Sequence, residues 1–391
     1  MPLILFGLFS RASLMKSLIF LANAGSPHVR QWSVCMRRLG IDYSVATIHQ
    51  GNLLADTRVC QYFPWLLHIG RAGELISYVL LGLWLRLRYL GRRNEVLLHA
   101  HNTSGYGLAA WLSGCTFIVT TYGSEIYTAP ARGGIYRRLI QAVLDRARII
   151  TASAPAMASF LQQHFSVPDN RLHAFTLGID SVFYPDLTAR IALRQSLGID
   201  QEELVWIYNR RITPLYNTLA VATAFRDYYE GSGSGHLILL EGDCDPSYRD
   251  AVRSAVASCS AVTLVSGFLD QETLRGWLSA ADFCISVPTT DQLSSSILEG
   301  IACGCLPVLL DNPAYLQVTR SSLATVVPIA TEMAFRDAFV SSAAKRDLLY
   351  SVAHESRVTE ILGEEFHIDI VCEHVRALYG MAQSNNGVRE A

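Results

Sequence analysis

Short apolar runs alternate with segments of helical periodicity along most of the chain. In the first half, five apolar runs predict buried strands at residues 17–22, 43–48, 96–101, 117–122 and 148–153. Between them, apolar positions recur at the spacing of amphipathic helices, at residues 29–40, 107–114 and 135–147. A strand followed by a helix and then another strand is typical of a parallel sheet covered by helices.

The same alternation is repeated in the second half. Apolar runs predict strands at residues 204–209, 236–242, 262–267, 283–288 and 306–311. Helical patterns lie between them at residues 219–230, 246–257, 271–281 and 294–304, and a last one follows at 368–381. Because no block contains only helices or only strands, we expect an α/β fold with two doubly wound, Rossmann-like domains.

Domain boundaries follow from turn residues. The segment LGIDSVFYP, residues 177–185, ends in a proline and marks the expected break. We therefore expect one domain over residues 1–183, a second over 184–365, and a C-terminal helix and tail over 366–391. A chain of 391 residues exceeds the size of one ordinary core, which agrees with two domains.

Charge differs between the halves. Residues 1–190 contain 18 basic against 9 acidic residues, whereas residues 191–391 contain 14 against 25. A basic first half favours anionic partners such as phosphates or acidic lipids, although chance surface composition gives the same asymmetry. The nine cysteines have no regular spacing, so we interpret them as reduced structural thiols of a cytoplasmic protein, with no metal site.

Two apolar segments are candidates for membrane targeting or membrane binding. Residues 1–14 form a poor signal peptide and are interpreted as a loose leader or an over-extended start. Residues 77–93 are too short in their uncharged part to span a bilayer, and arginines gather at one end. The segment is either a basic amphipathic helix on an anionic membrane surface or a plain core helix.

Candidate site residues follow the predicted strands, since ligands bind at the carboxyl ends of strands in open parallel sheets. His101 ends one strand, although a lone histidine there is more often structural. Ser26 and His28 lie in a small-residue turn after the first strand, and Tyr122 and Glu125 follow another. The dinucleotide fingerprint GxGxxG is absent from the turn after the first strand, so no dinucleotide cofactor is expected there.

The second half offers charged groups at two strand ends. Arg210 and Arg211 follow one strand, and a guanidinium there suits a diphosphate. Asp291 follows another strand, Ser294 to Ser296 begin a helix, and Glu299 lies one turn further on. Hydroxyls and free backbone N–H groups at a helix start suit a phosphate or a sugar, and a carboxylate accepts from vicinal hydroxyls. The alternative is a capping box with a solvated Glu299.

The Asp291-x7-Glu299 spacing followed by GIACGCLPV resembles the E-x7-E signature of retaining glycosyltransferase family 4, whose members have the GT-B fold of two Rossmann domains. The segments 26–40, 99–110, 120–127 and 177–185 resemble further parts of that family in the same order. The resemblance covers nearly the whole chain.

The resemblance implies a role for each matched residue. Glu299 would bind the ribose of a nucleotide sugar, and Asp291 with the backbone from Gln292 through Leu293 to Ser294 would bind the donor sugar. Arg211 would neutralise the leaving diphosphate, with Arg210 and Ser295 as further donor-binding residues. Arg211, Asp291 and His101 are the expected catalytic set, while Ser26, His28, Tyr122 and Glu125 are expected on the acceptor side.

Three positions depart from the family pattern. Tyr216 stands where the family has a lysine five residues after the arginine, Tyr122 replaces a histidine, and Asp291 replaces a glutamate. These departures bear on the transfer rate and on the choice of donor. The pattern Asp243-x-Asp245 is a metal motif in another glycosyltransferase fold, and we interpret it here as a coincidence of a loop.

The sequence thus predicts a metal-independent retaining glycosyltransferase without a bound cofactor, in cell-surface polysaccharide or glycolipid synthesis. Its partners would be a nucleotide-sugar donor, a glycan or lipid-linked acceptor, and through residues 77–93 an anionic membrane surface on the cytoplasmic side; nucleic acid is not expected. A sugar-nucleotide 2-epimerase, also built from two Rossmann domains, and a non-catalytic scaffold remain as alternatives.

Overall fold

The computed structural model describes residues 17–51, 57–242, 244–291, 293–351, 354–363 and 366–383. These residues form two compact units. The first takes residues up to Thr151, then 161–173, and then those from His374 on; the second takes 152–160 and 174–373. The sequence-based divisions after residues 183 and 365 both lie inside the second unit. The leader at residues 1–14 lies outside the described residues.

The first unit is built on a seven-stranded sheet with the order β3-β2-β1-β4-β5-β6-β7. Its strands are β1 (Ser17–Leu21), β2 (Tyr43–Thr47), β3 (Arg58–Gln61), β4 (Val96–His101), β5 (Thr116–Thr121), β6 (Ile149–Ala152) and β7 (Leu172–Ala174). The pairs from β3 to β5 are parallel. The helices are α1 (Pro27–Leu39), α2 (Arg71–Arg88), α3 (Gly105–Ser113), α4 (Ser124–Tyr127), α5 (Gly134–Arg146) and α6 (Pro155–Phe165).

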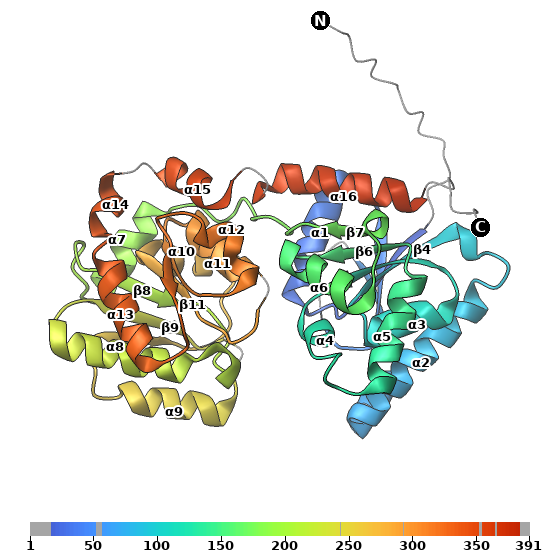
Figure 1. The fold of residues 1–391 in the computed structure, drawn as a ribbon, viewed down its shortest axis with the longest axis horizontal. Helices are drawn as coiled ribbons and strands as arrows, with labels where there is room; N and C mark the ends of the chain where they lie inside the picture. Colours follow the sequence, from blue (N-terminus) through green and yellow to red (C-terminus); the bar gives the residue numbers. More distant parts are fainter. Residues whose placement is uncertain are drawn as a thin grey trace, which may run out of the picture. The chain divides into compact units, whose positions relative to one another are not determined.

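The second unit is built on a six-stranded sheet with the order β10-β9-β8-β11-β12-β13, parallel throughout. Its strands are β8 (Val205–Tyr208), β9 (His236–Leu240), β10 (Val262–Val265), β11 (Phe283–Ser286), β12 (Leu306–Leu310) and β13 (Thr325–Val327). Its helices are α7 (Leu187–Ser196), α8 (Thr218–Ser232), α9 (Pro246–Val256), α10 (Gln271–Ala280), α11 (Ser295–Ala302), α12 (Leu316–Thr319), α13 (Glu332–Ala343), α14 (Arg346–Ser351) and α15 (His354–Leu362). Helix α8 packs against α9 and α13, and α7 against α10 (Figure 1).

The predicted fold class is confirmed, and each of the ten predicted apolar runs forms a strand. The central strands β4, β8, β9, β11 and β12 are buried at every residue, which explains their nearly continuous apolar sequence. Three short strands, β3, β7 and β13, were not predicted, because three or four partly polar residues give too little pattern. The helix expected around residues 77–93 instead begins at Arg71 and ends at Arg88.

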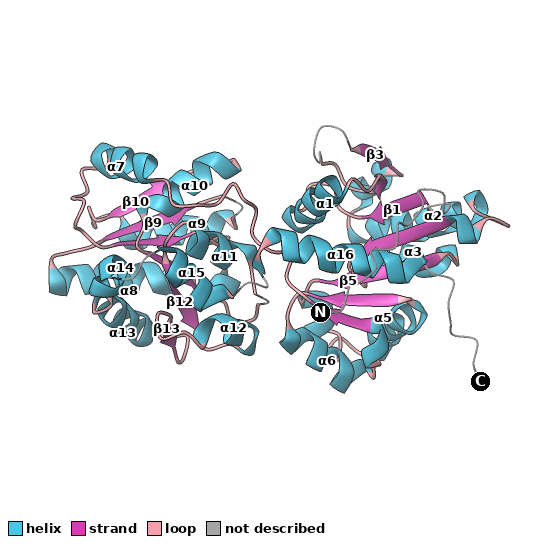
Figure 2. Cartoon of the chain, turned by 90° about the horizontal axis from the view of Figure 1, so that it is seen from above, coloured by secondary structure: helices cyan, strands magenta, loops and turns pink. Residues whose placement is uncertain are grey.

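Helix α16 (Ile368–Gln383) is one continuous helix near the end of the chain (Figure 2). The Tyr379 hydroxyl of its second half lies 2.6 Å from Nδ1 of His99 on β4, and both side chains are buried. Nε2 of the same imidazole lies 2.7 Å from the Thr120 hydroxyl on β5. Burial lowers the pKa of His99 to about 3, so the ring is neutral and acts as a packing and hydrogen-bonding group.

Candidate active site

Each sheet has one point where the strand order reverses, between β1 and β4 in the first unit and between β8 and β11 in the second. Neighbouring loops diverge at such a point and leave room at the carboxyl ends of the strands. His101 ends β4. In the second unit Arg210 follows β8 and Asp291 follows β11. The predicted site residues therefore gather at the two places where ligands enter folds of this type.

A buried ion pair joins the two central strands of the second unit. Nη2 of Arg210 donates to Oδ2 of Asp291 at 2.7 Å, and only 5% of the arginine side chain and 15% of the aspartate side chain are exposed. The hydroxyl of Tyr315, which follows β12, donates to the same oxygen at 2.7 Å. The ends of three neighbouring strands thus converge on one carboxylate.

Arg210 is held from a second side by an aromatic ring. Its guanidinium carbon lies 4.7 Å from the ring centre of Tyr216, a cation–π contact. The Tyr208 hydroxyl donates to the Tyr216 backbone carbonyl and ties the main chain of this residue to the end of β8. Nη1 of Arg210 is buried and has no hydrogen-bond partner among the described residues. A fixed guanidinium with an unsatisfied N–H group suits an anionic oxygen atom.

Arg211 lies differently from Arg210. Its side chain is exposed. The backbone of the following turn closes tightly, since the Thr213 N–H donates to the Arg211 carbonyl at 3.0 Å. The two arginines therefore present one buried and one solvent-facing cation at the end of β8, and the role of Arg211 stays a prediction.

Helix α11 begins at the predicted serine cluster. The Ser294 side chain caps the helix by accepting from the Ser296 N–H at 3.3 Å. Leu293 is buried beneath this turn. The Asn209 amide, directly after β8, donates to the Ser296 carbonyl at 2.9 Å and ties the helix start to the Arg210 loop. Gln292 lies outside the described residues.

The close backbone packing expected after Glu299 is present. A Cβ atom on Gly300 would lie 2.8 Å from Cβ and Sγ of Cys284 on β11, so only glycine permits this approach. Glu299, on the same turn of α11, is only partly exposed. Burial raises its pKa to about 7, Asp180 adds to the rise, and Ser295 and Arg210 oppose it. Glu299 is therefore a carboxyl group that ionises near neutral pH, not a freely solvated one.

A row of rings marks the corresponding place in the first unit. Nδ1 of His101 lies 2.7 Å from the Tyr122 hydroxyl. The Tyr122 ring stacks on the ring of His28, which is exposed, and the two ring centres are 4.7 Å apart. Nε2 of His101 is buried without a partner among the described residues. Burial, with His99 and His28 nearby, holds the His101 pKa well below its usual range. The ring is neutral and offers one unsatisfied nitrogen.

Glu125 organises the loop after β5. Its carboxylate accepts the Tyr122 N–H at 2.9 Å, and hydrogen bonds from the backbone of Glu125 and Thr103 counter the burial that raises its pKa. Glu125 thus fixes the loop that carries Tyr122. Ser26 stands at the N-cap of α1 without a side-chain capping bond. Whether these residues contact an acceptor stays a prediction.

Sequence reasoning missed two residues of the second-unit cluster, Tyr315 and Asn209. The rule that ligand-binding groups follow strand ends could have found both, since Asn209 directly follows β8 and Tyr315 lies five residues after β12. The metal motif at 243–245 falls partly outside the described residues, at Asp243. Asp245 caps α9 and accepts from the Tyr248 N–H at 3.0 Å. Within the described ranges no cluster of metal-ligating side chains occurs.

Comparison with known proteins adds two findings. Residues 25–183 match the sequence model of Glycosyltransferase Family 4. The structure resembles sucrose-phosphate synthase from Thermosynechococcus elongatus, with a TM-score of 0.73, 18% identity, and coverage of 93% of this chain and 98% of that chain. No curated protein matches by sequence.

Two further solved structures are similar over nearly their whole length. One is Anabaena Alr3699/HepE in complex with UDP and glucose, with a TM-score of 0.72, 14% identity, and coverage of 93% of this chain and 99% of that chain. The other is WaaG, a glycosyltransferase involved in lipopolysaccharide biosynthesis, with a TM-score of 0.70, 14% identity and the same coverage. These structures have the GT-B fold. The comparisons confirm the predicted fold class and the resemblance to family 4.

Proposed function

We propose that the chain, which has the GT-B fold and matches the Glycosyltransferase Family 4 model over residues 25–183, is a glycosyltransferase that moves a sugar, with retention, from a nucleotide-sugar donor to a glycan or lipid-linked acceptor. The observation that carries the proposal is the Arg210–Asp291 pair beside Glu299, at the switch point of the second sheet. A buried cation with an unsatisfied N–H, next to carboxylates that accept from hydroxyls, matches the two ends of a nucleotide sugar.

The donor would lie along the first turn of α11. Glu299 accepts from the ribose hydroxyls, and Asp291 with the backbone around Leu293 and Ser294 holds the sugar. The diphosphate lies at the end of β8, where Nη1 of Arg210 donates to it and Arg211 adds a second positive charge. The comparison structures of HepE with UDP and with UDP-glucose support a nucleotide-sugar donor.

The chemical step breaks the bond between the anomeric carbon and the diphosphate and forms a bond to the acceptor oxygen on the same face. The acceptor proton moves to the departing phosphate oxygen. The chain's contribution is to stabilise the charge that develops on the diphosphate, which the fixed Arg210 guanidinium does without reorganisation. The neutral His101 ring, whose pKa lies well below its usual range, acts as a hydrogen-bonding group toward sugar hydroxyls.

Metal independence is part of the proposal. The second-unit cluster supplies positive charge from arginine at the place where other transferases use a divalent cation. Tyr216 supports this interpretation, since it occupies the position of the family's lysine and holds Arg210 through its ring. Arg210 would then supply the charge that the lysine supplies elsewhere. No resident cofactor is required for this reaction.

A donor screen tests the function directly. Nucleoside diphosphate release from a panel of nucleotide sugars, with lipid extract as acceptor source, should occur at an unchanged rate in EDTA. The anomeric configuration of the product, measured by NMR, should equal that of the donor. Loss of turnover in EDTA would contradict metal independence. Sugar interconversion without an acceptor would indicate the epimerase instead, and the absence of nucleotide binding in calorimetry would indicate the scaffold.

Helix α2 supports a membrane-associated acceptor. One face, with Tyr78, Leu81 and Leu85, is buried, and Gly82 packs so closely on α3 that a Cβ atom would lie 2.8 Å from the Ala109 carbonyl oxygen. The helix is apolar on the other side as well. We define the α2 patch by the exposed residues Trp65, Ile69, Leu75, Ile76, Leu83, Trp84, Leu87 and Leu90.

Basic side chains accompany the α2 patch. Arg71, Arg86, Arg88, Arg92 and Arg93 lie on or next to the helix, against only Glu74 and Glu95 as acids. Apolar side chains next to clustered arginines fit the surface of an anionic bilayer. Within the described residues, no helix is both long and apolar enough to cross a bilayer. We therefore propose a peripheral position on the cytoplasmic face of a membrane.

Vesicle sedimentation tests the α2 patch. The variant Leu87→Asp/Leu90→Asp should bind vesicles containing anionic lipid at least about tenfold more weakly than the wild type, since two exposed leucines no longer enter the apolar layer. Ile135→Asp changes an even more exposed apolar side chain in the same unit and should bind like the wild type. Neutral phosphatidylcholine vesicles should bind weakly to all three. Equal binding of wild type and double variant, or dimerisation through the patch without vesicle binding, would contradict the proposal.

A further inference from the structure

Asn102, which directly follows His101 at the end of β4, has a backbone conformation that side chains rarely adopt. Its φ is +127°, whereas the other three non-glycine residues with positive φ in the described ranges have values between 51° and 57°. Values near 57° belong to the left-handed helical region, which asparagine tolerates, but a φ of +127° is used mainly by glycine. Such a conformation persists only where surrounding contacts hold it, and it occurs most often at functional sites.

Hydrogen bonds from the start of helix α3 hold Asn102 in this conformation. Its Oδ1 accepts from the backbone N–H groups of Gly105 at 3.1 Å and Tyr106 at 3.0 Å. Gly107 packs on its main chain, since a Cβ atom there would lie 2.8 Å from the Asn102 carbonyl oxygen. The side chain of Asn102 therefore caps the helix that fixes its own backbone. A side chain without an oxygen atom would lose both hydrogen bonds.

The residue after Asn102 is tied to the neighbouring strand end. Thr103 is buried, and its backbone donates to the Glu125 carboxylate. The same carboxylate accepts from the Tyr122 N–H at 2.9 Å, and the Tyr122 hydroxyl lies 2.7 Å from Nδ1 of His101. Covalent bonds and hydrogen bonds thus form a closed path through these five residues, which we call the β4–β5 cycle. Because three of its members are consecutive, the backbone at Asn102 sets where the Thr103 N–H lies relative to the His101 ring.

The β4–β5 cycle determines what His101 offers to a substrate. Nδ1 faces Tyr122, whereas Nε2 is buried and has no hydrogen-bond partner among the described residues. In a neutral imidazole, the hydrogen bond at one nitrogen decides which nitrogen carries the proton. Hydrogen bonds to the ring are directional, so a rotated imidazole would direct Nε2 elsewhere. Both the tautomer and the direction of Nε2 therefore depend on the contact with Tyr122.

We propose that Asn102 is a positioning residue of the transfer reaction, which holds His101 and Tyr122 in the geometry that presents Nε2 to the sugar substrate. The proposal rests on the proposed glycosyltransferase function, in which His101 bonds to sugar hydroxyls. Asn102 acts through Thr103 and Glu125. Its unusual backbone conformation is the cost of this geometry, and the two hydrogen bonds from α3 offset that cost.

The variants Asn102→Gly and Asn102→Asp test this role in transfer assays. Glycine adopts a positive φ without strain but removes the capping oxygen, so the turn loses its anchor on α3. The transfer rate of Asn102→Gly should fall at least about tenfold, because the catalytic group is misplaced. Its affinity for nucleoside diphosphate, measured by calorimetry, should be unchanged, since the proposed donor residues lie in the second unit. Aspartate keeps an accepting oxygen at the same place and should retain most of the transfer rate.

The imidazole nitrogen resonances of His101, assigned with a His101→Gln variant, report the geometry independently of activity. A single tautomer fixed by Tyr122 should give two widely separated nitrogen signals in the wild type and in Asn102→Asp. In Asn102→Gly the two signals should move toward each other as the ring exchanges between tautomers. If the wild type transfers no sugar, the proposed function fails, and these resonances alone then decide whether Asn102 positions His101.

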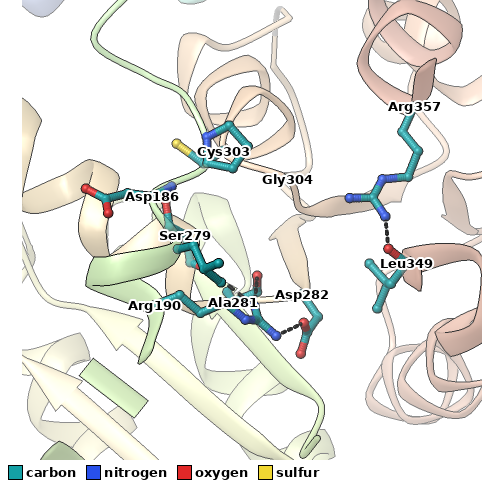
Figure 3. A pocket seen from close by; sticks show the side chains of 11 residues that line it. Asp186, Arg190, Ser279, Ala281, Asp282, Cys303, Gly304, Leu349 and Arg357 are labelled. Carbon is teal, nitrogen blue, oxygen red and sulfur yellow. Dashed lines mark hydrogen bonds and ion pairs between the residues drawn. The ribbon is translucent and has the colours of Figure 1, made fainter. Parts of the chain in front are cut away.

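The variant Asp186→Ala is the matched control for the loss of a helix cap. Asp186 caps α7 by accepting from the Ala189 N–H at 2.9 Å. It lies in the wall of a cavity of about 210 Å³ that also includes Asp282, the residue before β11 (Figure 3). The cavity is thus at the amino end of that strand, away from the candidate active site. This control should melt at a lower temperature but keep the wild-type transfer rate and His101 resonances.

A further variant keeps the test decisive if Asn102→Gly does not fold. Glu125→Gln opens the β4–β5 cycle from its other side, because an amide has one accepting oxygen where the carboxylate has two. It should show the same reduced rate and shifted resonances at unchanged nucleotide affinity. A wild-type rate in folded Asn102→Gly would overturn the proposal, as would a reduced rate with wild-type His101 resonances. Asn102→Asp transferring as slowly as Asn102→Gly would also contradict it.

Discussion

An Arg210→Met variant should lose at least about a hundredfold in transfer rate and unfold at a temperature roughly 10 °C lower. The rate falls because the guanidinium that stabilises the departing diphosphate is gone. Stability falls because Asp291, with 15% of its side chain exposed, loses the guanidinium that pairs with its carboxylate, and Oδ2 retains only Tyr315 of its two described partners. Removing one member of a buried ion pair costs about 3–5 kcal/mol.

Two further variants separate stability from activity. Arg210→Met/Asp291→Leu removes both members of the ion pair, so it should recover most of the lost stability, measured by denaturant unfolding, while remaining inactive. Arg211→Met removes the exposed neighbouring cation and should leave the melting temperature nearly unchanged. Its transfer rate, compared with that of Arg210→Met, measures how much each arginine contributes to stabilising the charge on the diphosphate. A full transfer rate in folded Arg210→Met would show that the buried arginine only supports the fold.

Glu299→Gln should weaken nucleotide binding at pH 8 by at least about tenfold and yet stabilise the free protein there. The reason is the raised pKa of Glu299, about 7 in the folded chain because of burial, against an ordinary value near 4.5. Ionising this group in the folded state costs free energy, at most about 3.5 kcal/mol at about 1.4 kcal/mol for each pKa unit. A glutamine avoids that cost but offers the ribose no carboxylate.

The pH dependence has a defined sign. Stability of the wild type should fall as pH rises from about 4.5 to about 7, so the advantage of Glu299→Gln should be largest at pH 8 and absent at pH 4. Nucleotide affinity of the wild type should fall below pH 7, where Glu299 becomes protonated. Calorimetry with nucleoside diphosphates and denaturant unfolding at both ends of this range measure the two effects. An affinity that stays constant from pH 5.5 to pH 8 would contradict the role given to Glu299.

The central strands and the helices between them could be predicted from the sequence. Strands that are buried on both faces have a nearly continuous apolar sequence, which is easy to recognise. Strands such as β4 and β12 are apolar at nearly every position, and the helices between them have a different period. The short strand β7, Leu172–Ala174, gives no comparable pattern. The return of α16 to the first unit could not be predicted either, since its apolar stripe shows that it packs but not on which sheet.

The candidate site was predictable to the level of strand ends but not of contacts. The spacing of Asp291 and Glu299 placed both carboxylates around the start of one helix. It could not tell that Arg210 is buried against Asp291 while Arg211 is exposed, because adjacent residues at a strand end differ in direction only through the local turn. The pKa of Glu299 likewise depends on the burial of its side chain, which a sequence pattern does not measure.

Helix α16 has a consequence for how the chain matures. Tyr379 and the buried side chains Val375 and Leu378 complete the interior of the unit that begins with β1, some 350 residues earlier. During synthesis, that interior stays incomplete until helix α16 leaves the ribosome, although the second unit has by then emerged almost whole. A protein cut after residue 183 would lack this segment, and its exposed His99 surface would favour aggregation over a native monomer.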